Sequence, residues 1–114
     1  MGSLSKKFSV AFKGLIIAFK DKSIRLQGII SILVILFGII YKFQMNEWMW
    51  IFSCIILVLL TEMINTCIER ICDLIDESQN EKIKYIKDLS AGSVLLASIY
   101  SIVIGCMVLG GVLR

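Results

Sequence analysis

The sequence contains no proline and no histidine, and it is poor in charged residues. Without proline, nothing in the backbone forces a long helix to break. The absence of histidine excludes imidazole acid–base catalysis, Ser-His triads and histidine metal sites. Only 18% of the 114 residues are charged and 58% are hydrophobic, whereas a soluble domain carries about 25% charged residues. This balance argues against a soluble enzyme, a disordered tail and a nucleic-acid-binding module.

The four cysteines form no recognisable framework. Cys67 and Cys72 are five residues apart, and no Cys-x-x-Cys motif occurs in the sequence. Most of the cysteines lie within apolar runs, where cysteine behaves as a small buried hydrophobe. We therefore expect neither a disulfide framework nor a zinc site.

Three apolar runs dominate the chain, at about residues 24–43, 48–68 and 89–113. Each has close to the 20 or so residues with which a helix crosses about 30 Å of hydrocarbon. A helix also satisfies its own backbone hydrogen bonds, as lipid requires. We expect a single all-α membrane domain over residues 1–114, with spans at about 24–43, 48–75 and 89–113.

The N-terminal segment has a different pattern, which predicts an amphipathic helix at about residues 4–21. Large apolar residues recur there every three or four positions, and lysines fall between them. Such a helix can lie flat on an anionic membrane surface. The apolar run at 14–19 is too short for a signal peptide, so we expect no cleavage. Basic residues gather in 1–25 and 70–88 and predict that these segments are cytoplasmic.

Polar residues follow one face of the second predicted span toward its cytoplasmic end. They are Glu62, Asn65, Glu69, Asp73 and Asp76, at helical spacing. An ionisable group in mid-membrane costs about 3 kcal/mol, so Glu62 requires an explanation. Glu62 and Asn65 could simply form an interhelical hydrogen-bond pair, and Asp73 and Asp76 could be a solvated helix end. Carboxylates at a membrane–water boundary also suit Mg²⁺ with bound phosphates, which we favour.

Two further polar pairs, Asp21 with Arg25 and Lys87 with Asp88, are expected at the same interface. The pattern Glu62-x-x-Asn65-x-x-x-Glu69-x-x-x-Asp73, followed by Lys87-Asp88 and Ala91-Gly92-Ser93-Val94, resembles the small bacterial integral-membrane lipid kinases. These are the prokaryotic diacylglycerol kinases and undecaprenol kinases. The segment 91–94 is most similar to the Gram-positive branch, whose members resemble undecaprenol kinases.

This resemblance implies transfer of a phosphoryl group from MgATP to a lipid hydroxyl, either undecaprenol or diacylglycerol, at the cytoplasmic face of the bacterial inner membrane. It also implies a homotrimer whose active sites are shared between protomers. Glu62 matches the general base, and Asn65 and Arg25 match residues beside the lipid substrate. Asp21 and Glu69 match the carboxylates that hold Mg²⁺ and ATP, and Lys87 and Asp88 match the nucleotide-contacting pair.

A small transport or channel subunit, with an ion site at Glu62 and Asn65, is the alternative. An ion path should carry polar residues through the whole depth of the bilayer. The outer halves of all three predicted spans lack charged residues. A one-sided polar cluster therefore favours an enzyme that works at the interface.

Overall fold

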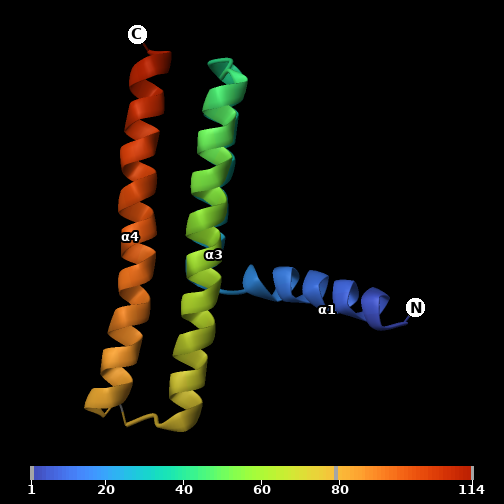
Figure 1. The fold of residues 1–114 in the computed structure, drawn as a ribbon, viewed down its shortest axis with the longest axis vertical. Helices are drawn as coiled ribbons and strands as arrows, with labels where there is room; N and C mark the ends of the chain where they lie inside the picture. The colour runs from blue at the N-terminus through green and yellow to red at the C-terminus, as the bar shows by residue number, and fades with distance from the viewer. Residues whose placement is uncertain (1, 79, 114) are drawn as a thin grey trace.

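The computed structural model describes residues 2–78 and 80–113, which form four helices and no strand. Helix α1 covers Gly2–Ala18, α2 Lys22–Ile40, α3 Met45–Ile75 and α4 Glu81–Val112. Helices α3 and α4 run side by side in opposite directions, and α1 runs crosswise to them (Figure 1). Helix α2 packs mainly against α3, so α3 is the central element. The all-helical class predicted from the sequence is confirmed.

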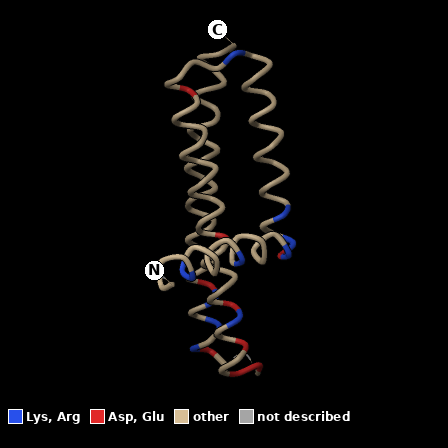
Figure 2. The backbone as a smooth tube through the Cα atoms, turned by 90° about the vertical axis from the view of Figure 1, so that its right-hand side faces the viewer, with Lys and Arg blue, Asp and Glu red and all other residues tan. Residues whose placement is uncertain are grey.

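Three of these helices are long and apolar enough to cross a membrane: α2, α3 and α4. In their most apolar 18-residue windows no more than 22% of the residues are buried within the chain. The remaining apolar side chains must therefore face lipid or another protein surface. Charged residues gather at and below the level of α1, whereas the upper parts of the helices are nearly free of charge (Figure 2). This distribution is that of a membrane protein with one polar end.

The turn between α2 and α3 closes the apolar end of the molecule. After the last turn of α2, Lys42 adopts a left-handed conformation with φ of 54°. The Phe43 amide then donates to the Gly38 carbonyl at 2.9 Å, and the Lys42 amide donates to the Ile39 carbonyl at 3.3 Å. These two bonds satisfy carbonyls that the helix end would leave free, in the pattern of a Schellman motif.

The main apolar core lies beside this turn. Phe43, Ile51 and Val108 are buried there, and Phe37 and Trp48 pack against them. The Phe43 ring contacts the rings of Phe37 and Trp48, with centroid separations of 5.9 and 5.3 Å. This cluster ties α2, α3 and α4 together at the end of the molecule opposite to most of the charged residues.

Gly38 allows this cluster to form, and its replacement should loosen it. A Cβ atom at Gly38 would lie 2.6 Å from the Trp48 ring and 2.8 Å from the Phe43 ring. Moving packed rings costs about 1–3 kcal/mol, which exceeds the gain of up to about 1 kcal/mol from alanine in a helix. We expect Gly38→Ala to lower the thermal unfolding midpoint in detergent micelles, followed by tryptophan fluorescence. A Cβ at Gly110 would meet nothing within 4 Å, so Gly110→Ala is the control that should not lower it.

Two details differ from the sequence prediction. Phe19, which we expected on the surface helix, follows the end of α1, and its ring lies 3.0 Å from where a Cβ of Gly28 would be. Asp76, which we expected on the polar face of the second span, is the extended residue that follows α3, with φ of −162°. Helix α1 ends at Ala18 and α3 ends at Ile75, so both residues lie just outside their helices.

Candidate active site

Glu62 lies on the face of α3 that also carries the buried residues Ile51, Cys54 and Val58. Only 9% of Glu62 is exposed, which makes it one of two buried polar residues in the described chain. Asp21 lines a surface groove together with Met63 and Thr66, which adjoin Glu62 on α3. The three carboxylates that the sequence singled out therefore lie on neighbouring parts of the molecule. They come from the start of α2 and from two successive parts of α3.

Asn65 lies one turn from Glu62, on the same side of α3. Its amide oxygen Oδ1 is buried and has no hydrogen-bond partner among the described residues. Glu69, one further turn along, is exposed. The polar face thus runs from a buried carboxylate to an accessible one, and a water-soluble phosphate compound could reach only the second directly.

Asp21 has a structural role that the sequence analysis missed. Its Oδ2 atom accepts hydrogen bonds from the backbone amides of Ser23 at 3.1 Å and Ile24 at 3.3 Å, and so caps the N-terminus of α2. An aspartate directly before an apolar helical run is the usual signal of such a cap. The cap fixes the carboxylate beside α3 and leaves Oδ1 free of any hydrogen bond among the described residues.

Lys87 and Asp88 do not act as a pair in this structure. The Lys87 ammonium binds the Asp73 carboxylate of α3 at 2.6 Å, and Asp88 binds Lys84 of its own helix at 2.9 Å. The Lys87 side chain is only 20% exposed, whereas Lys84 is 67% exposed. Asp73, whose role the sequence left open, therefore anchors Lys87 across the two helices. Sequence spacing could not have revealed this contact, because it joins residues of separate helices.

Arg25 lies in the first turn of α2 and is exposed. It takes part in neither of the two ion pairs found among the described residues. Arg25 thus follows Asp21 by four residues, but its side chain forms no ion pair with Asp21, Glu62 or Glu69.

The connection between α3 and α4 is held by Asp76. Its carboxylate accepts hydrogen bonds from the Ser78 amide at 2.8 Å, the Ser78 hydroxyl at 2.5 Å and the Asn80 amide group at 2.7 Å. These bonds, first the one from the Ser78 hydroxyl, lower the pKa of Asp76 below its usual 3.8. Asn80 in turn caps α4 by accepting from the Ile83 amide at 3.0 Å. These bonds fix where α4 begins and hence the position of Lys87 along α3.

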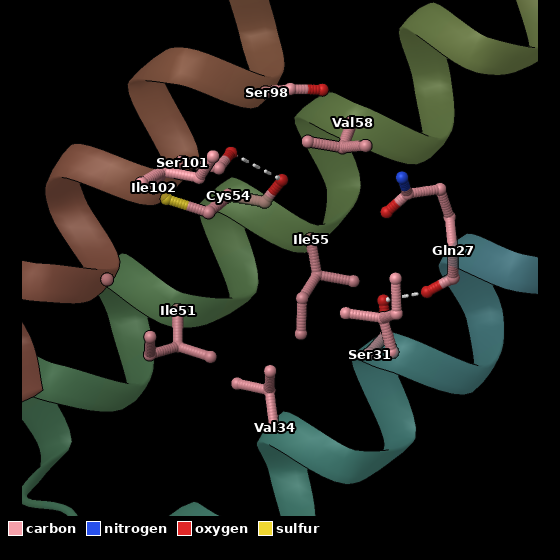
Figure 3. A pocket seen from close by; sticks show the side chains of 12 residues that line it. Gln27, Ser31, Val34, Ile51, Cys54, Ile55, Val58, Ser98, Ser101 and Ile102 are labelled. Carbon is pink, nitrogen blue, oxygen red and sulfur yellow. Dashed lines mark hydrogen bonds between the residues drawn. The ribbon is translucent and has the colours of Figure 1, made fainter.

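A surface groove of about 700 Å³ lies beside Asp21, between α1, the start of α2 and α3. Its polar lining includes Lys20, Asp21 and Arg70, and its apolar lining includes Ile17 and Met63. A second cavity of about 340 Å³ lies between α2, α3 and α4 (Figure 3). No charged residue lines this second cavity. Of the two, only the surface groove combines an apolar wall with groups that attract phosphate.

The carboxylates fit a magnesium ion that arrives with a nucleotide. The described residues contain no cluster of three or more Asp, Glu or Cys side chains able to enclose a metal ion. Mg²⁺ usually keeps several waters and binds one or two carboxylates together with the phosphates of its substrate. Glu69, which is exposed, and the free oxygen of Asp21 are a donor set of that kind.

Comparison with known proteins identifies the family. A family model described as prokaryotic diacylglycerol kinase matches residues 9–109. The chain is 29% identical over 88 residues to the undecaprenol kinase of Bacillus subtilis strain 168, an alignment that covers 77% of this chain and 72% of that protein. It is 41% identical over 59 residues to a diacylglycerol kinase of Synechocystis sp., covering 50% of this chain but only 33% of that protein.

The chain belongs to the prokaryotic diacylglycerol kinase family. It is thus a lipid kinase, as the resemblance of its sequence motifs to this family implied, and not the transport or channel subunit kept as the alternative. As a kinase of this family it takes its phosphoryl group from ATP.

Proposed function

We propose that this protein phosphorylates the hydroxyl group of a membrane polyprenol of the undecaprenol type, with MgATP as the donor. Diacylglycerol is the alternative acceptor. The observation that carries the proposal is the buried carboxylate of Glu62, which shares one face of α3 with the exposed carboxylate of Glu69. The relative named undecaprenol kinase, matched over most of its length, supports the choice of lipid.

In the proposed reaction, Glu62 accepts the proton of the lipid hydroxyl as its oxygen attacks the terminal phosphorus of ATP. The bond from that phosphorus to the bridging oxygen breaks, and ADP leaves. Phosphoryl transfer relies on positioning and on charge stabilisation. A magnesium ion held by Glu69 and Asp21 would neutralise part of the phosphate charge. Lys87 supplies a cation that Asp73 holds at 2.6 Å, and Asp88 contacts the nucleotide.

The two substrates then reach the cluster from different sides. The lipid stays in the bilayer, with Asn65 and Arg25 beside its hydroxyl end. The nucleotide comes from the aqueous side, where Glu69 is exposed. In this arrangement the charged end of the molecule faces the cytoplasm at the inner membrane, α1 lies on the membrane surface, and three copies form a trimer.

A direct assay tests this proposal. The purified protein in detergent micelles is given radiolabelled ATP and Mg²⁺ with undecaprenol, with diacylglycerol or with no lipid, and labelled lipid is separated by chromatography. We expect label on undecaprenol at a rate at least about tenfold above that on diacylglycerol. Faster labelling of diacylglycerol would reverse the choice of lipid, and labelling of neither would refute the proposal.

A further inference from the structure

Two buried polar atoms in the described chain have no hydrogen-bond partner: Asn65 Oδ1 on α3 and Ser90 Oγ on α4. Ser90 is only 7% exposed, and it is the second of the two buried polar residues. A buried polar group without a partner costs about 1–3 kcal/mol. Groups of this kind are therefore expected to find a partner in the working protein.

The packing of α3 against α4 places these two atoms at the same level. Higher in the interface, the Ser101 hydroxyl donates to the Cys54 carbonyl at 3.5 Å (Figure 3). Ser90 precedes Ser101 by eleven residues, and Asn65 follows Cys54 by eleven residues. Eleven residues make about three full turns of a helix. Because the helices are antiparallel, Ser90 faces Asn65 as Ser101 faces Cys54.

The orientation of the Asn65 amide makes this pairing chemically useful. Its oxygen is the buried end, and its nitrogen Nδ2 is not among the buried unpartnered atoms. A hydrogen bond donated to this oxygen would prevent the amide group from rotating by 180°. The N–H groups of Nδ2 would then remain directed away from the interface. The neighbouring hydroxyl of Ser93 cannot serve, because it already donates to the Ser90 carbonyl at 2.7 Å.

We propose that Ser90 is a positioning residue for phosphoryl transfer: its hydroxyl donates to Asn65 Oδ1 and so aims the Asn65 N–H groups at the lipid oxygen beside Glu62. A hydrogen bond between the two would satisfy both atoms. This role rests on the proposed function, in which Asn65 lies at the lipid hydroxyl. The hydrogen bond itself does not depend on which lipid is the substrate.

The bond can be tested without any activity measurement. In ¹⁵N-labelled protein in micelles, the side-chain amide resonances of Asn65 are identified by their loss in Asn65→Asp. We expect Ser90→Ala to shift these resonances, and Ser93→Ala, which removes a hydroxyl of the same helix, to leave them in place. Unchanged Asn65 resonances in a folded Ser90→Ala protein would refute the contact.

Kinetics then test the role of the bond. We expect Ser90→Ala to lower kcat about tenfold, because a misplaced group near the reacting atoms costs up to about a hundredfold, with the KM for ATP little changed. Ser90→Thr keeps the hydroxyl and should retain most of kcat. Ser101→Ala removes the equivalent serine three turns away and should leave kcat unchanged. Shifted resonances with a normal kcat would overturn the positioning role, whereas a wild-type protein that phosphorylates no lipid would refute the proposed function instead.

Discussion

Replacing Glu62 by glutamine should lower kcat by about 10²–10⁴-fold, the usual contribution of general acid–base catalysis. Glutamine has nearly the same size and can keep hydrogen bonds at this buried position, but it cannot accept the proton of a lipid hydroxyl. The loss falls on the transition state, so the affinity for MgATP should change little. The measurement is kcat at saturating lipid and MgATP, with the oligomer checked by size-exclusion chromatography.

The same variant separates catalysis from packing. If Glu62 only joined helices through hydrogen bonds, glutamine would replace it and turnover would stay near that of the wild type. Near-normal kcat in an intact oligomer would therefore end the assignment of Glu62 as the base. Glu77→Gln is a matched control, since Glu77 is an exposed carboxylate just beyond the end of α3. It changes the net charge equally and should leave kcat unaffected.

The fold was predictable because the constraint that shapes it is simple. In lipid, an apolar run of about 20 residues can satisfy its backbone hydrogen bonds as a membrane-spanning helix. The described structure has three helices long and apolar enough for this. Helix ends were less predictable, because single contacts decide them. Asp76 follows α3 in an extended conformation, and three donors bind its carboxylate there. Phe19 lies just beyond the end of α1, and its ring lies beside Gly28 of α2.

The site was predictable in part for the same physical reason. Glu62 and Glu69 share a face of one helix, and helical spacing alone reveals such a face. Contacts between separate helices carry no signal in the spacing. The ion pair between Asp73 and Lys87 depends on where α4 begins, which the Asp76 connection sets. The facing positions of Asn65 and Ser90 depend on the register of α3 against α4.

Glu69 and Asp21 should contribute unequally to the binding of magnesium. Asp21 already uses its Oδ2 atom for two backbone amides at the start of α2. Glu69 is exposed and has no hydrogen bond among the described side chains. Both carboxylate oxygens of Glu69 can therefore bind a metal ion that arrives with a nucleotide, whereas Asp21 has only one oxygen free for it.

We accordingly expect Glu69→Gln to weaken MgATP binding at least about tenfold, which is about 1.4 kcal/mol, and to remove the dependence of that binding on Mg²⁺. Isothermal calorimetry with MgATP and with metal-free ATP measures both effects on the intact oligomer. Metal-free ATP should bind the variant and the wild type alike, because Lys87 and Asp73 are untouched. Glu77→Gln again serves as the charge-matched control. Undiminished MgATP affinity in Glu69→Gln would show that Glu69 does not bind the magnesium ion.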